Sequence, residues 1–172
     1  MLLFIRHGET DFNHKGLWMG CTDIELNERG RQQALSAAKA LSEKSIDIIF
    51  TSPLKRAYIT AQTIADQQLH KPPVIILNDL RERGFGILEG TPRDKPLNDD
   101  FDNIEGVEKK DTLIKRLTAV LSSIEKDAHK SILIVSHGGI FHCLTHEMGY
   151  GSNPSSEGTQ IGNCEPVELF KK

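Results

Sequence analysis

Residues 1–10 read MLLFIRHGET, and residues 132–139 read ILIVSHGG. In both stretches a short apolar run leads within two residues to a histidine that is followed by glycine. Apolar runs of this length, rich in branched side chains, are typical of strands that are buried on both faces of a parallel sheet. The two stretches therefore predict two such strands, Met1–Ile5 and Ile132–Val135, each with polar residues at its carboxyl end.

The rest of the chain alternates between strand and helix patterns. Two more apolar runs predict strands at Ile46–Phe50 and Val74–Leu77. Helical spacing of apolar residues predicts helices within 34–41, 54–65, 113–124 and 139–148. This alternation predicts an α/β sandwich around a mostly parallel sheet, and with neither a linker nor a repeat we expect one domain over residues 1–172.

Three local signals refine the expected element ends. Asn27 is expected to cap the first long helix. Ser52 and Pro53 suit the cap and the first position of the next helix. Near the end of the sequence, Val167–Phe170 is expected to add an edge strand.

The composition excludes several classes of function. The chain has 172 residues, of which 38% are hydrophobic and 26% are charged, as in ordinary globular proteins. Its net charge of 21 − 24 = −3 gives no support for binding to nucleic acid. The run Met1–Ile5 is too short for a signal peptide or a membrane span. Cys21, Cys143 and Cys164 form no disulfide framework or cysteine-based zinc motif, so we expect a cytoplasmic protein.

Reactive side chains follow the predicted strands. Arg6 and His7 come after the first run, Arg56 after the second, Glu82 after the third and His137 after the fourth. Because ligands bind at the carboxyl ends of parallel strands, we expect these five side chains to meet at one edge of the sheet. Arginines bind phosphate, histidine is an accepted nucleophile, and a glutamate can protonate a leaving alkoxide. The set predicts phosphoryl transfer that needs neither a metal nor another cofactor.

Four ordered blocks of sequence carry a family resemblance. Arg6-His7-Gly8-Glu9-Thr10 with Asn13 resembles the signature of the histidine phosphatase superfamily, also called the phosphoglycerate mutase-like family. The resemblance continues over about residues 1–145. Its other members are Gly20, Asp23, Leu26, Gly30, Gln33, Ala34, Ser52-Pro53-Leu54, Arg56-Ala57, Glu82, Phe85-Gly86, Glu89-Gly90, Gly106, Glu108, Arg116 and Ser136-His137-Gly138-Gly139. It implies a three-layer α/β/α sandwich.

The resemblance also implies catalytic roles by position. His7 corresponds to the nucleophile that becomes phosphohistidine. Arg6, Arg56 and His137 correspond to the rest of the phosphate pocket. Glu82 corresponds to the proton donor that later activates water. For His7 to attack, one ring nitrogen must be unprotonated, so we expect the other to donate to a backbone carbonyl.

A second group of residues is implied in binding the substrate. Asn13 corresponds to a further phosphate contact, and Thr10 belongs to the same signature. The backbone near Gly20 and Gly138 is expected to line the site. Glu9 corresponds to a supporting residue that orients the pocket.

The reaction and the substrate stay open at this point. A small phosphorylated metabolite hydrolysed to inorganic phosphate is the first expectation. The alternatives are a mutase-type phosphotransferase, a protein phosphohistidine or phosphotyrosine phosphatase, and a catalytically silent phosphate-binding regulator on the same fold. The sequence identifies no partner protein.

Residues 91–110 are expected to form a lid that disfavours substrates with several negative charges. Its acidic residues are Asp94, Asp99, Asp100, Asp102, Glu105 and Glu108, against the basic Arg93, Lys95, Lys109 and Lys110. Trp18 and Met19, in the loop 7–26, either belong to a core or line the substrate pocket. His142 and His146 have the spacing of zinc ligands, but without the general-base glutamate of metalloproteases we favour a structural role.

Overall fold

The computed structural model describes residues 1–94, 99–127, 130–154 and 161–172. Lys95 and the side chains of Asp99 and Asp100, which were assigned to the acidic lid, lie outside the described part. No helix within the described residues is both long enough and apolar enough to cross a membrane.

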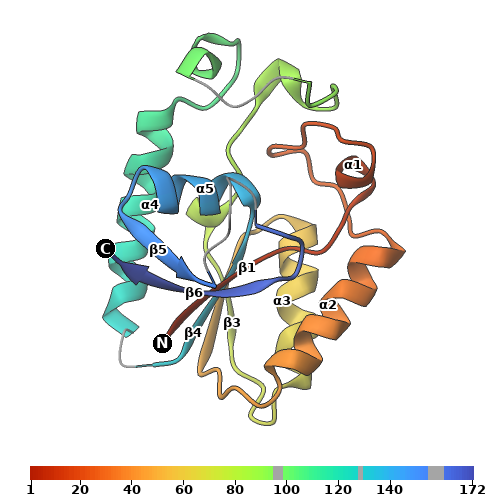
Figure 1. The fold of residues 1–172 in the computed structure, drawn as a ribbon, viewed down its shortest axis with the longest axis vertical. Helices are drawn as coiled ribbons and strands as arrows, with labels where there is room; N and C mark the ends of the chain where they lie inside the picture. The colour runs from red at the N-terminus through yellow and green to blue at the C-terminus, as the bar shows by residue number, and fades with distance from the viewer. Residues whose placement is uncertain (95–98, 128–129, 155–160) are drawn as a thin grey trace.

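A six-stranded sheet forms the centre of the molecule, in the order β3-β2-β4-β1-β6-β5 (Figure 1). The strands are β1 (Leu2–Arg6), β2 (Ile48–Thr51), β3 (Val74–Ile76), β4 (Ile132–Ser136), β5 (Tyr150–Asn153) and β6 (Pro166–Lys171). The first four strands in this order run parallel, and β6 and β5 are added in antiparallel pairing. The prediction of a mostly parallel sheet is confirmed.

Helices cover both faces of the sheet (Figure 1). The α-helices are α1 (Asp11–His14), α2 (Glu28–Leu41), α3 (Lys55–Gln67), α4 (Lys110–Ile124) and α5 (Gly138–His146). Short 3₁₀ turns are η1 (Asn78–Leu80), η2 (Gly86–Leu88), η3 (Asp99–Asn103) and η4 (Glu125–Asp127). Buried residues of α2 and α3 form a core on one face, and those of α4 and α5 form a core on the other. This is the three-layer sandwich that the resemblance implied.

The central strands contribute to both cores because successive side chains of a strand point to opposite faces. In β1, Phe4 packs with α4 and α5, whereas Leu3 and Ile5 pack with α2 and α3. The edge strand β3 departs from the expectation of burial on both faces: Ile75 and Ile76 are 39% and 49% exposed. Its position at the edge of the sheet accounts for the difference.

Of the two predicted helix starts, the one at Asn27 is confirmed and the one at Ser52 and Pro53 is wrong. Asn27 caps α2, with its side chain accepting a hydrogen bond from the Gly30 N–H at 2.8 Å. Ser52 and Pro53 do not start α3, which begins at Lys55. There Asp23 supplies the cap from another loop, accepting from the Lys55 N–H at 2.8 Å.

The strand predicted at Val167–Phe170 exists but is not at the edge of the sheet. It lies within β6, between β1 and β5. Strand β5, which was not predicted from the sequence, pairs with β6 and takes the edge position.

Candidate active site

His7 lies directly after β1, and its ring is held by two neighbours. The Nδ1–H donates to the carbonyl oxygen of Gly8 at 2.7 Å, and the Nε of Arg56 donates to Nε2 at 3.3 Å. A carbonyl can only accept and an arginine N–H can only donate, so both contacts require the same neutral tautomer. The lone pair of His7 therefore lies on Nε2, as a nucleophile needs.

The pKa of His7 is held well below its usual value by burial and by the charges of Arg56 and Arg6. The ring is almost completely buried. Each cause opposes the protonated form, so the ring is neutral over the physiological range.

Arg56 lies in the first turn of α3 and is 0% exposed. Two backbone carbonyls of another loop hold its guanidinium: Nη1 donates to Thr22 at 2.8 Å and Nη2 to Gly20 at 2.7 Å. Burial lowers its pKa to about 10, and the charge of Glu82 opposes this shift. The side chain therefore stays cationic at neutral pH, with its Nε turned toward His7.

Arg6 and His137 contribute nitrogen atoms that are buried without a hydrogen-bond partner among the described residues. These atoms are Nε of Arg6 and Nδ1 of His137. The two rings of His7 and His137 are 5.1 Å apart between centroids. Gly138 follows His137 and lies against Arg6, because a Cβ added to it would be 3.6 Å from that Nε. Buried donors of this kind need an acceptor, and an anion beside His7 would supply it.

The pKa of His137 is also well below its usual value, through burial and the charges of Arg56 and Arg6. Its Nε2 lies 2.7 Å from the hydroxyl oxygen of Ser52. That oxygen accepts from the Leu54 N–H, so its own proton is available for Nε2. In this arrangement Nδ1 of the neutral ring carries a proton toward the site.

Glu82 is buried on the path from β3 to η2. Its Oε1 accepts from the Arg83 N–H at 2.8 Å, and its Oε2 from the Gly139 N–H at 3.0 Å. A Cβ at position 139 would lie 2.4 Å from Oε1, so only glycine leaves room for the carboxyl group. The negative charge of Glu82 acts on both Arg6 and Arg56.

The five predicted catalytic side chains thus lie together at the carboxyl ends of parallel strands. The sequence pattern of the Histidine phosphatase superfamily (branch 1) matches residues 2–169. The chain belongs to this superfamily.

Similar proteins agree with this membership. The phosphatase PhoE of Bacillus subtilis (strain 168) is 38% identical over 162 residues, which cover 93% of this chain and 82% of that protein. Phosphoglycerate mutase-like protein 4 of Arabidopsis thaliana is 37% identical over 159 residues, which cover 83% and 68%. The structure of a phosphoserine phosphatase from Entamoeba histolytica is 29% identical, with a TM-score of 0.72 and coverage of 96% and 87%.

The other residues of the superfamily signature take supporting positions. The hydroxyl of Thr10 caps α1, and the side-chain oxygen of Asn13 accepts from the Thr10 N–H at 3.2 Å. The Glu9 carboxylate points toward α2, where it accepts from Asn27 at 3.0 Å and lies 3.7 Å from Arg29. Gly20 contributes its carbonyl to Arg56, as described above. Binding of substrate by these residues stays a prediction.

Two supporting groups were not recognised from the sequence. The carboxylate of Glu89 accepts from the backbone N–H groups of Cys21, Thr22 and Phe85, so it holds the loop whose carbonyls hold Arg56. Arg116 donates to the carbonyls of Arg81 and Glu82 and is paired with Glu108. Glu89, Glu108 and Arg116 belong to the resemblance, but the contacts of Glu89 with Cys21 and Thr22 and of Arg116 with Arg81 and Glu82 join segments that are 34 or more residues apart.

In the part of the chain that the structure describes, no three His, Cys, Asp or Glu side chains are grouped so as to hold a metal ion. The rings of His142 and His146 stack with centroids 4.1 Å apart. The Nδ1–H of His146 donates to the carbonyl of His142 at 3.1 Å, which ties the ring to its own helix.

Proposed function

We propose that this chain is a phosphomonoesterase that hydrolyses a small phosphorylated metabolite through a phosphohistidine on His7, without a metal ion. The observation that carries the proposal is the fixed neutral tautomer of His7, with its Nε2 lone pair beside Arg56. A histidine held in this form is a ready nucleophile. Cations around it suit a transition state whose charge spreads over three phosphoryl oxygens.

In the proposed complex the phosphoryl group lies between His7 and the surrounding donors. Arg6 offers the unpartnered Nε and His137 the unpartnered Nδ1. Arg56 gives up its contact with His7 Nε2 and donates to a phosphoryl oxygen instead. The donors of Arg6 and His137 are already in position, so Arg56 is the one that has to shift when the phosphoryl group binds.

The reaction then runs in two balanced steps. The Nε2 lone pair of His7 forms a bond to phosphorus while the ester P–O bond breaks. The departing oxygen takes a proton from Glu82, which binds that proton when the phosphate dianion arrives beside it. The resulting carboxylate of Glu82 removes a proton from a water molecule, whose oxygen attacks phosphorus. The P–N bond breaks, which restores His7 and releases inorganic phosphate.

We propose hydrolysis ahead of mutase chemistry because three relatives named as phosphatases match 83% or more of this chain, whereas those named as 2,3-bisphosphoglycerate-dependent mutases match 48–55%. The phosphatase PhoE matches 93% of this chain. The 2,3-bisphosphoglycerate-dependent phosphoglycerate mutase of Bartonella bacilliformis matches 54% of this chain and 47% of its own length. As the location we propose the cytoplasm, because Cys21, Cys143 and Cys164 are all free.

The test is the hydrolysis of p-nitrophenyl phosphate in the presence of EDTA. We expect turnover by the unmodified protein and none by His7→Ala. In Glu82→Gln we expect phosphoenzyme to accumulate, because p-nitrophenolate leaves without a proton whereas water is no longer activated. Mass spectrometry of the intact protein detects the added phosphoryl group. Turnover that survives in His7→Ala, or that EDTA abolishes, would contradict the proposal.

A further inference from the structure

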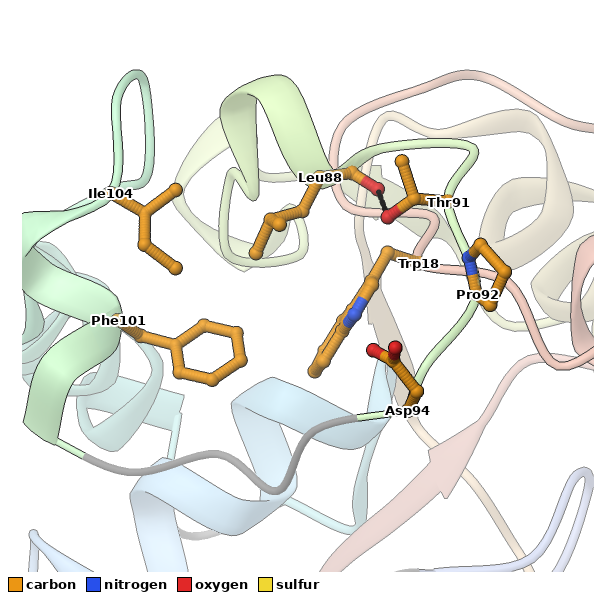
Figure 2. A pocket seen from close by; sticks show the side chains of 7 residues that line it. All are labelled: Trp18, Leu88, Thr91, Pro92, Asp94, Phe101 and Ile104. Atoms are coloured by element: carbon orange, nitrogen blue, oxygen red, sulfur yellow. Dashed lines mark hydrogen bonds between the residues drawn. The ribbon is translucent and has the colours of Figure 1, made fainter.

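An apolar cavity of about 220 Å³ lies among the segments that cover the top of the molecule in Figure 1. Figure 2 shows its walls: Trp18 and Phe101 face it from opposite sides, and Leu88 and Ile104 close one end. Trp18 is 4% exposed and packs on Phe85 and Phe101, so it belongs both to a small core and to the cavity. None of the residues in the proposed reaction steps lines this cavity.

Arg93 and the segment that carries Trp18 link the cavity to the phosphate site. The guanidinium carbon of Arg93 lies 4.9 Å from the centre of the Trp18 ring. Arg93 is also near Arg6, since its charge adds to burial in lowering the pKa of Arg6. In addition, Trp18 is two residues from Gly20, whose carbonyl holds Arg56. A substrate whose phosphoryl group lies beside His7 therefore has this cavity within reach of its alcohol half.

The size of the cavity suits one ring. An apolar cavity of about 150 Å³ is enough to hold benzene. The space of about 220 Å³ beside Trp18 therefore accommodates a ring with a short substituent. Flat aromatic walls favour an aromatic or cyclic group over a flexible polar chain.

The polar groups of the cavity are acceptors. The Thr91 hydroxyl donates its proton to the Leu88 carbonyl at 2.7 Å, so toward the cavity it can only accept (Figure 2). Asp94 presents a carboxylate beside Trp18. Of the described residues that line the cavity, none is a cation. A second anionic group inside the cavity would meet the negative charge of Asp94, whereas the nearby cation, Arg93, lies against the Trp18 ring and not in the lining.

We propose that this cavity binds the alcohol half of the substrate, and that this half is an uncharged ring that carries a hydroxyl or amino donor. The inference rests on the proposed phosphatase function and adds its substrate class. Burial of the ring supplies binding energy away from phosphorus, and Asp94 selects against substrates with a second anionic group.

A binding experiment tests the cavity without catalysis. Trp18 is the chain's only tryptophan, so its fluorescence reports the occupancy of the cavity. In His7→Ala protein we expect phenyl phosphate to change the Trp18 emission in a saturable way, and glycerol 3-phosphate to change it much less at equal phosphate occupancy. Equal responses to the two ligands would overturn the proposal.

A second experiment compares substrates in two variants. Ile104→Phe fills the cavity, and we expect the ratio of kcat/KM for phenyl phosphate to that for acetyl phosphate to fall by roughly tenfold or more. Asp94→Asn removes the charge, and we expect 4-carboxyphenyl phosphate to improve relative to phenyl phosphate. Asp66→Asn, on the exposed side of α3, makes the same change of charge elsewhere and should alter neither ratio.

The outcomes separate the two proposals. Unchanged ratios in both Ile104→Phe and Asp94→Asn, with hydrolysis intact, would overturn the ring subsite and leave the phosphatase function standing. A selective Trp18 response in a protein that hydrolyses none of the esters would support the subsite and contradict the phosphatase function.

Discussion

At the scale of single residues, the chemistry of the site depends on which atoms surround the rings of His7 and His137. The order of reactive residues after the strands was enough to predict that these side chains meet, because parallel strands end at one edge. The expected backbone acceptor for His7 is also confirmed, in the form of the Gly8 carbonyl. The partner of His137 was not predictable, since Ser52 lies 85 residues away and looked like a helix cap.

The two buried histidines make stability depend on pH. The folded-state pKa of each lies well below its usual value, first through burial and then through neighbouring charges. The unfolded chain therefore takes up protons first, below about pH 6.5, and the free energy of unfolding should fall by about 1.4 kcal/mol per pH unit for each histidine. Above that pH this contribution is fully present.

Urea unfolding between pH 7.5 and about pH 5 measures this slope, over a window that begins above the usual histidine pKa. We expect His137→Gln to reduce the slope and His70→Gln, at an exposed position, to leave it unchanged. If the free energy of unfolding falls equally steeply with pH in the unmodified protein, His137→Gln and His70→Gln, then His137 does not remain neutral in the fold.

At the scale of elements, the loop that carries His7 packs directly on the start of α2. A Cβ added to Gly30 would lie 2.0 Å from the Glu9 carbonyl oxygen, and one added to Gly8 would lie 2.4 Å from the Gly30 carbonyl oxygen. Both glycines belong to the superfamily resemblance, but their contact joins two segments and cannot be read from either one. The two backbones can approach only where neither carries a side chain.

We therefore expect Gly30→Ala to destabilise the fold and to slow catalysis. Alanine would favour a helix by about 1 kcal/mol, but the clash with Glu9 costs more, typically about 1–3 kcal/mol for overpacking. Since relief of the clash moves the segment after His7, kcat should fall as well. Thermal unfolding and kcat measure the two effects, and Ser36→Ala, exposed on the same helix, is the control. A stabilised Gly30→Ala would contradict the close approach.

Glu89 positions Arg56 through the loop between them. Burial opposes its ionisation, but hydrogen bonds from the Thr22 hydroxyl and from the backbone of Cys21, Phe85 and Thr22 outweigh burial and lower its pKa. The same loop supplies both carbonyls that hold the guanidinium of Arg56.

Replacement of Glu89 by glutamine keeps its shape but weakens these hydrogen bonds. We expect kcat of Glu89→Gln to fall by about tenfold or more, as when one transition-state donor is misplaced. The Tm should fall as well, because the hydrogen bonds that lower the pKa of Glu89 stabilise the folded state. Glu43→Gln, at an exposed position, is the control. An unchanged kcat would mean that Arg56 keeps its position without Glu89.

At the scale of the whole molecule, the predictions succeeded for the parallel half of the sheet and for the gathering of the site. They failed for the order of β5 and β6, because pairing in a sheet depends on contacts between distant segments. The acidic residues within 91–110 were expected to act together on the substrate, but two of them form ion pairs with arginines. Asp102 is paired with Arg83, and Glu108 with Arg116, so these charges stabilise the fold. Asp94 is the acidic side chain that lines the cavity.

The pairing of Asp102 with Arg83 connects three parts of the molecule. Asp102 lies in η3, its carboxylate accepts from the Lys110 N–H at the start of α4 at 3.1 Å, and Arg83 follows Glu82, the proposed proton donor. Asp102→Ala removes both interactions. We expect a loss of about 1–2 kcal/mol in the free energy of unfolding, from the cap and a partly exposed ion pair together.

Because η3 also carries Phe101, the loss of this connection should loosen the cavity wall. For phenyl phosphate we expect the KM of Asp102→Ala to rise more than kcat falls, whereas acetyl phosphate, with no ring, should show a smaller rise. Asp102→Asn retains an acceptor for the Lys110 N–H, so its free energy of unfolding and its KM should lie between those of the unmodified protein and those of Asp102→Ala. If Asp102→Ala instead lowers kcat with KM unchanged, Asp102 acts through Arg83 on Glu82, the proposed proton donor, and the cavity wall does not depend on Asp102.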